Sequence, residues 1–201
     1  MATSYVTIED LGPLPPPVVA RPRVLLVGTV FACAAVLATF GGLLAIYLAT
    51  RASTLAADDE WLGGANIPLT PGNMSLIGFV LSLFTMQWAV WAIGNDDRRH
   101  TWMAFAATLF VGAFHMVGTG FLYSQMGLEV ATPQGALVYA LTGSHLVFLG
   151  AAMVFAALMA FRTLGGQYSA KDREGVVAAA VVWYVMVAVY GAIWYAVLVT
   201  K

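Results

Sequence analysis

Charge is scarce in this chain. Only 9% of its 201 residues are Asp, Glu, Lys or Arg, whereas a soluble domain averages about 25%. Hydrophobic residues make up 61% of the sequence, and the formal net charge is −1. The chain thus lacks the clustered Lys and Arg that nucleic-acid binding needs. These shortages exclude an ordinary soluble domain and a nucleic-acid partner, and they predict a polytopic membrane protein.

Cysteine is nearly absent as well. The one cysteine, Cys33, stands inside an apolar run and cannot form a disulfide within the chain. We expect it to be a small buried apolar side chain. The first residues carry Glu9 and Asp10 and lack a basic segment before an apolar core, so no cleavable signal peptide is expected.

Long apolar runs are abundant. A membrane-spanning helix needs about 20 predominantly apolar residues, and a helix satisfies its own backbone hydrogen bonds in lipid. Five runs are long enough, and the connection between the first two is expected to span residues 52–73. The sequence predicts an all-α fold, a polytopic membrane helix bundle over residues 21–201, with transmembrane helices at 24–49, 74–93, 101–125, 136–161 and 176–200.

Residues 1–20 differ from the rest. Proline cannot continue a helix, and four prolines in this segment predict an extended proline-rich cytoplasmic arm: Pro13, Pro15, Pro16 and Pro17. The arm is either disordered or docked on a partner. Docking is the favoured alternative because Tyr5, Val6, Ile8 and Leu11 give it apolar surface to bury.

The basic residues predict the orientation, because cytoplasmic loops carry an excess of Lys and Arg. Seven of the nine fall on one side of the predicted bundle: Arg21, Arg23, Arg98, Arg99, Arg162, Lys171 and Arg173. We therefore expect a multi-pass protein of the bacterial inner membrane with its N-terminus cytoplasmic and its C-terminus outside. An interfacial belt is expected to account for most of the five tryptophans near helix ends or shoulders: Trp88, Trp91, Trp102, Trp183 and Trp194.

Two histidines interrupt the apolar runs. His115 lies about 11 residues before the end of the third run and His145 about 10 residues after the start of the fourth, so both are expected at similar depth. Two imidazoles at one depth could hold a b-type haem. The alternative is structural, because a buried histidine commonly bonds a backbone carbonyl or a neighbouring side chain.

Polar residues near the ends of the third run are further candidates for subunit or lipid contact. Gln125 and Glu129 are four residues apart, one helical turn, and are expected to share a helix face. They form either a solvated helix end or a polar cluster, with Tyr123 and Ser124, at a subunit contact or lipid headgroup. Arg98 and Arg99 lie in a short charged turn that is solvent-exposed or holds anionic lipid headgroups.

Residues for catalysis by the chain alone are not evident. Acidic residues fall almost entirely in the predicted loops, and neither a nucleophile–histidine pair nor a phosphate-binding loop can be placed. A small transporter is a weaker alternative, because transport sites normally place ionisable groups or broken helices near the midplane.

Two stretches, RPRVLLVGTVFACAAVLATFGGLLAIYLATRA and FTMQWAVWAIGNDDRR, are similar to the first helix and to the second helix with its basic turn of a known family. That family is subunit III of the haem–copper oxidases, the accessory subunit of cytochrome c oxidase, in its short five-helix form. GFLYSQMGLEV resembles F-L-x-x-Q-x-x-E, LTGSHLVFLGA resembles T-G-x-H-x-x-H-V-x-x-G, and VVWYVMVAVYGAIWYAVLV resembles the last helix. The resemblance covers residues 21 to 200.

Positions that are polar in the family are mostly apolar here. Val36 replaces a membrane glutamate, Phe148 a second histidine, and Val187 an aspartate, while Tyr184 stands where the family has histidine. The family glutamate of the third motif falls at Leu128, and Glu129 follows one position later. The chain therefore resembles a divergent member of the family.

The resemblance implies a noncatalytic subunit without cofactors of its own. It implies haem and copper in partner subunits I and II, bound phospholipids, and support of sustained proton-coupled oxygen reduction, with a respiratory supercomplex as a further candidate partner. An accessory subunit of nitric oxide reductase is the alternative within the same broad family, and a transporter or b-haem protein is the alternative outside it.

Overall fold

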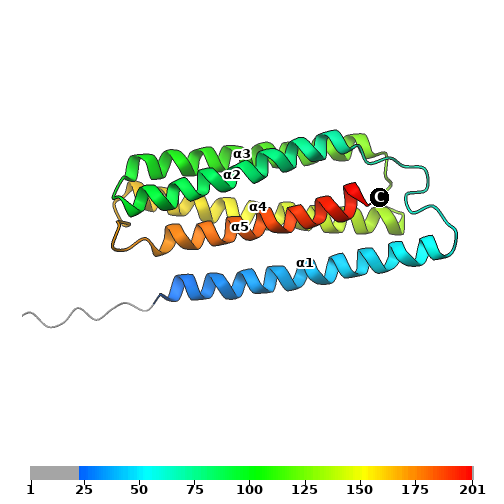
Figure 1. Cartoon of the computed structure of the whole chain (residues 1–201), viewed down its shortest axis with the longest axis horizontal. Helices are drawn as coiled ribbons and strands as arrows, with labels where there is room; N and C mark the ends of the chain where they lie inside the picture. Colours follow the sequence, from blue (N-terminus) through cyan, green and yellow to red (C-terminus); the bar gives the residue numbers. More distant parts are fainter. Residues whose placement is uncertain (1–22, 201) are drawn as a thin grey trace, which may run out of the picture.

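The computed structural model describes residues 23–200, and within that range the chain is helical with no strand (Figure 1). The five α-helices are α1 (Val24–Ala56), α2 (Leu69–Gly94), α3 (Arg98–Met126), α4 (Pro133–Leu164) and α5 (Glu174–Ile193). A π-helical segment, Trp194–Val199, continues α5. The predicted all-α, five-helix fold is confirmed.

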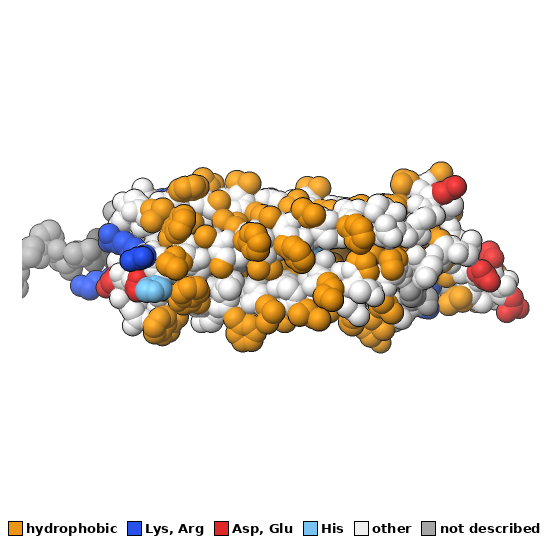
Figure 2. All heavy atoms as spheres, turned by 90° about the horizontal axis from the view of Figure 1, so that it is seen from above, with side chains coloured by type: hydrophobic (Ala, Val, Ile, Leu, Met, Phe, Trp, Pro, Cys, Tyr) orange, Lys and Arg blue, Asp and Glu red, His pale blue; other side chains and the backbone are white. Residues whose placement is uncertain are grey.

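All five helices are long and apolar enough to cross a membrane, with mean hydropathies of 1.6 to 2.3 over their most apolar windows. Large apolar side chains are exposed around the middle of the bundle, and the visible charged side chains gather at its two ends (Figure 2). Phe84 is 71% exposed and Phe110 73%. Such surfaces are stable in lipid and would aggregate in water. The chain is a multi-pass membrane protein.

Helices extend beyond the apolar runs that predicted them. The connection between the first two helices is shorter than the predicted loop 52–73, because α1 continues to Ala56 and α2 begins at Leu69. Hydrogen bonding carries α1 onward, and the Thr54 hydroxyl donates to the Thr50 carbonyl at 3.0 Å. Pro71 lies in the first turn of α2, where backbone N–H groups have no helical partner to lose.

The α5 helix lies at the centre of the bundle and α1 at its edge. α5 packs against α1, α2 and α4, whereas α1 contacts chiefly α5. Over its most apolar window α5 is 56% buried and α1 only 17%. One polar contact fixes the start of α1: the Leu26 N–H donates to Glu174 Oε1 at 2.8 Å. A carboxylate is favourable there because the first N–H groups of a helix have no intrahelical acceptor.

Single polar contacts also join the other helices. Thr85 and Thr108 join α2 to α3 at 2.7 Å between hydroxyls. The Tyr123 hydroxyl donates to Thr142 Oγ1 at 2.7 Å, joining α3 to α4. Hydrogen bonds of this kind, together with close packing, hold helices together where lipid supplies no hydrophobic drive.

One of the five tryptophans lies outside the predicted interfacial belt. Trp91 and Trp102 are 63% and 40% exposed, consistent with interfacial positions, but Trp183 is fully buried in the core. Its indole N–H donates to Ser82 Oγ at 2.8 Å, so its polar atom is satisfied without reaching the interface. Cys33 is buried and free, as expected.

The predictions for residues 1–20 lie outside the described residues. Because the number of described spans is odd, Arg23 and Thr200 lie at opposite ends of the bundle (Figure 1). Many charged side chains of the described chain also lie at those two ends. Arg98, Arg99, Arg162, Lys171 and Arg173 stand at the end where α3 begins, and Asp58, Asp59 and Glu60 at the other.

Candidate functional site

The two histidines singled out in the sequence meet in the core. His115 on α3 and His145 on α4 are each 1% exposed. Their ring centroids are 5.5 Å apart and their planes meet at 85°. The expectation that they lie at one depth on neighbouring helices is confirmed.

Their hydrogen bonding differs. His145 Nε2 pairs with the Met186 backbone carbonyl of α5 at 3.1 Å. Neither ring nitrogen of His115 has a hydrogen-bond partner, although the backbone of Ser75 lies nearby. His115 is held instead by aromatic packing: the Phe79 ring stacks on it at 4.4 Å and the Tyr190 ring meets it edge-on at 4.2 Å.

This packing tests the haem interpretation. A porphyrin ligated by both histidines would need a flat slot between the two imidazoles. Phe79 and Tyr190 occupy that region, because each also lies close to His145, at centroid distances of 6.0 Å and 5.4 Å. The residues leave no room for a macrocycle, so the packing favours a structural role for the pair. No three His, Cys, Asp or Glu side chains gather as a metal site within residues 23–200.

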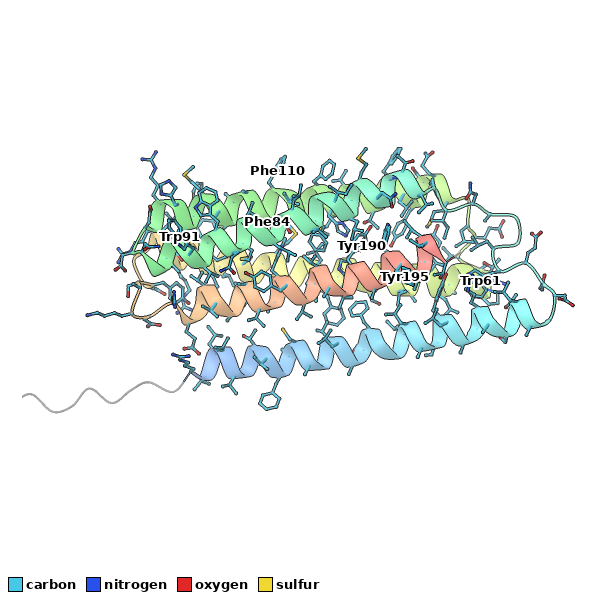
Figure 3. The ribbon with its side chains drawn as sticks, viewed as in Figure 1. Trp61, Phe84, Trp91, Phe110, Tyr190 and Tyr195 are labelled. Carbon is cyan, nitrogen blue, oxygen red and sulfur yellow. The ribbon has the colours of Figure 1, made fainter. Side chains whose placement is uncertain are left out.

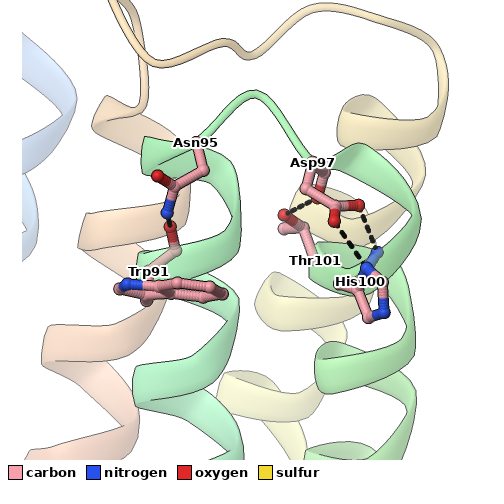
Figure 4. Close-up of polar contacts among 5 residues, drawn as sticks. All are labelled: Trp91, Asn95, Asp97, His100 and Thr101. Atoms are coloured by element: carbon pink, nitrogen blue, oxygen red, sulfur yellow. Dashed lines mark hydrogen bonds and ion pairs between the residues drawn. The ribbon is translucent and has the colours of Figure 1, made fainter.

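Arg98 and Arg99 open α3 at the turn after α2 and are exposed. The start of the helix is fixed by Asp97, whose Oδ1 accepts the His100 N–H at 3.0 Å and whose Oδ2 pairs with His100 Nδ1 at 2.5 Å (Figure 4). These hydrogen bonds lower the pKa of the Asp97 carboxyl. Within the described chain neither arginine forms a salt bridge, so both guanidinium groups are available to anions.

The two connections at this end of the bundle are joined. The Ala170 N–H donates to Asp96 Oδ1 at 2.6 Å, linking the turn after α2 to the loop after α4. Asp96 has φ = 57°, a left-handed conformation that Asp tolerates better than most residues. The basic surface around Arg98 therefore rests on a fixed pair of loops.

The expectation that Gln125 and Glu129 share a helix face is wrong. Helix α3 ends at Met126, and Gly127 adopts a left-handed φ of 60° that turns the chain away from the helix axis. Glu129 therefore lies beyond the helix, where it lines an open groove of about 470 Å³ together with Gly63, Gly64 and Gln134. Gln125 and Glu129 are both exposed.

The positions that depart from the family pattern are packed as apolar core. Val187 is 5% exposed and Leu128 8% exposed. Val36 and Phe148 are half-buried against the core, and Phe148 meets Phe40 edge-on at 5.7 Å. The apolar replacements are therefore integrated into the packing of this bundle.

Sequence reasoning missed two carboxamides on the exposed side of α2. Gln87 Oε1 accepts the Tyr184 hydroxyl at 2.6 Å, and Asn73 Oδ1 accepts the Trp194 indole N–H at 2.8 Å. Both amides are exposed. Their signal in the sequence is the presence of two carboxamides within one apolar run, fourteen residues apart and hence on nearly the same helix face.

Comparison with known proteins finds relatives that share one name. No protein-family model matches the chain. Over 149 residues it is 28% identical to the probable cytochrome c oxidase subunit 3 of Mycobacterium leprae (strain TN), covering 72% of each chain. Over 176 residues it is 27% identical to the probable cytochrome c oxidase subunit 3 of Nocardia farcinica (strain IFM 10152), covering 82% of each.

A third similar protein is the cytochrome c oxidase subunit 3 of Corynebacterium diphtheriae, 29% identical over 146 residues, covering 70% of this chain and 68% of that protein. These identities are modest, but each match runs over most of both chains. With its five helices able to span a membrane, the chain is similar to cytochrome c oxidase subunit 3 over most of its length, and these matches support a divergent member of that family.

Proposed function

We propose that this chain is an accessory, noncatalytic membrane subunit of an aerobic respiratory terminal oxidase. It packs beside larger subunits, corresponding to subunits I and II, that carry haem and copper. The observation that carries the proposal is the match of most of the chain to proteins named cytochrome c oxidase subunit 3. The described bundle supports a noncatalytic role, because the rings of Phe79 and Tyr190 pack against both core histidines.

The distribution of charge supports a location in the bacterial inner membrane with the start of α3 in the cytoplasm. Basic residues collect at that end, as cytoplasmic loops require. Arg98 and Arg99 are exposed there without a salt bridge from the described chain, and we assign them to anionic phospholipid headgroups. Gln125 and Glu129, at the opposite end, are assigned to subunit contact.

Purification of the tagged chain from its native membrane in a mild detergent tests the function. The expected result is recovery of larger subunits with the absorption of haem a and the signal of copper A. Non-haem iron in place of copper A would assign the chain to a nitric oxide reductase. A Soret band from the isolated chain would overturn the accessory function and return His115 and His145 to haem ligation. Flux through proteoliposomes that contain only this chain would point to a transporter.

A further inference from the structure

One face of the bundle has the pattern of a helix-packing surface, and no helix of residues 23–200 covers it. Exposed residues follow α2 at alternating spacings of four and three, and we call this row the α2 seam: Asn73, Ile77, Val80, Phe84, Gln87 and Trp91. A 4–3 spacing is the 3.5-residue repeat by which one helix packs along another. The apolar members are well exposed, with Phe84 at 71% and Trp91 at 63%.

Two polar pairs border the seam on the side of α5. Gln87 is bonded to Tyr184 and Asn73 to Trp194, so both carboxamide oxygens already accept a hydrogen bond. An indole N–H can only donate, so the bond from Trp194 places the Asn73 oxygen toward α5 and its NH₂ group away. The NH₂ groups of Gln87 and Asn73 donate to no acceptor within the described chain.

The depth of Gln87 makes its free amide costly. The α2 helix has 26 residues and is therefore about 39 Å long, against a hydrocarbon layer of about 30 Å. Gln87 stands seven residues from the end of α2, about 10 Å along the axis, and so falls within the hydrocarbon layer. An amide N–H without an acceptor in lipid is unfavourable. Asn73 is nearer the other end of the helix and lies close to the interface.

Between the two polar pairs α5 presents small residues: Ala188 and Ala192 are exposed, and Gly191 is half-exposed. A Cβ added at Gly191 would meet no atom within 4 Å. α5 runs between α2 and α1 in this view (Figure 1), and Phe84 and Trp91 lie along α2 beside it (Figure 3). Small residues flanked by large apolar ones let an added helix approach closely.

We propose that the α2 seam and the small residues of α5 bind a transmembrane helix of the metal-bearing partner subunit. That helix offers hydrogen-bond acceptors to the amides of Gln87 and Asn73, and small side chains opposite Phe84 and Trp91. The partner helix must supply acceptors, because the carboxamide oxygens of Gln87 and Asn73 already accept hydrogen bonds. Their NH₂ groups have no acceptor within the described chain. This assignment rests on the proposed function, since it names the face through which the subunit is held.

Photo-crosslinking in the native membrane tests the face. The chain offers a matched pair: p-benzoylphenylalanine replaces Phe84 on the seam or Phe110 on the outer side of α3, and the two positions are 71% and 73% exposed. We expect a crosslink to the haem-bearing subunit from position 84 and none from position 110. A crosslink to that subunit only from position 110 overturns the proposal while leaving the proposed function intact. A crosslink from position 84 to a second copy of this chain also overturns it.

A second pair of variants tests the packing. Gly191→Leu places a large side chain among the small residues of α5 beside the α2 seam. Gly120→Leu places the same side chain on α3, and a Cβ at either position meets no atom within 4 Å. Gly191→Leu is expected to lower co-purification of the partner about tenfold, and Gly120→Leu to leave it unchanged. Gln87→Leu is expected to lower it about threefold, the size of an average hydrogen bond between membrane helices.

A tyrosine control separates the amide from the local fold. Tyr184→Phe removes the hydroxyl that bonds Gln87 but keeps the free NH₂ group, so partner recovery should persist. Equal recovery from wild type, Gly191→Leu and Gln87→Leu overturns the proposal. If the wild-type chain recovers no metal-bearing subunit at all, the proposed function itself fails.

Discussion

Trp183 on α5 donates its indole N–H to the hydroxyl of Ser82 on α2, 101 residues earlier in the chain, at 2.8 Å. The Ser82 hydroxyl in turn donates a hydrogen bond to the Phe79 carbonyl at 2.5 Å. Both residues are fully buried. The contact fixes two helices that are not neighbours in sequence, and it sits directly beside Phe79, which stacks on His115.

Replacing this indole should destabilise the bundle. Trp183→Phe removes the hydrogen bond and leaves space in the core, at a cost of about 1–3 kcal/mol. Trp91→Phe is the matched control because Trp91 is 63% exposed, and it should change stability little. Unfolding of both variants in detergent, followed by circular dichroism, measures the difference. Equal loss from the two variants would show that the core contact contributes nothing specific.

Two glycines on α3 should respond oppositely to alanine. A Cβ at Gly112 would come within 2.7 Å of the Trp183 ring and 3.2 Å of the Met153 sulfur, whereas one at Gly120 would meet nothing within 4 Å. We expect Gly112→Ala to destabilise the protein by about 1–3 kcal/mol through overpacking. Gly120→Ala should be neutral or stabilising by up to about 1 kcal/mol, because alanine is the better helix former. Thermal unfolding of the two variants gives the sign of each change.

Acid should remove the contribution of the α3 cap. Hydrogen bonds from His100 lower the pKa of Asp97 in the folded protein. A carboxyl with a lowered folded-state pKa stabilises the fold above its ordinary pKa of about 4, and that contribution is lost as the pH falls through the lowered value. Thermal midpoints of wild type and Asp97→Ala should therefore differ at neutral pH and converge below pH 4. A constant difference across this range would contradict the assignment.

The two core histidines should differ when each is replaced by phenylalanine. His145→Phe loses the hydrogen bond to the Met186 carbonyl and should destabilise the bundle by about 1 kcal/mol. His115→Phe removes two buried nitrogens without partners and keeps an aromatic ring against Phe79, so it should be neutral or stabilising. Unfolding in detergent compares them, and greater destabilisation from His115→Phe would indicate a ligand or partner at that ring.

The number of helices, their order and their apolar character follow from the amino-acid sequence alone. The five apolar runs predict five helices, because a segment that crosses the hydrocarbon layer must satisfy its own backbone hydrogen bonds and a helix does so. The sequence also predicts that His115 and His145 share a depth, since a rise of about 1.5 Å per residue converts position in a run into depth. Helix ends were less accurate: the apolar run of α1 stops at residue 49, but its hydrogen bonding continues to Ala56.

The direction in which each side chain faces emerges only from the packing of the folded chain. Trp183 reads as an interfacial residue until its indole is seen bonded to Ser82 inside the core. Gln125 and Glu129 read as one helical turn until the left-handed Gly127 ends α3 between them. Gln87 reads as one polar residue among many apolar ones until Tyr184 is seen to occupy its oxygen from another helix. In a bundle that is apolar throughout, hydrophobicity hardly distinguishes the inner face of a helix from the outer, so packing between distant segments makes that choice.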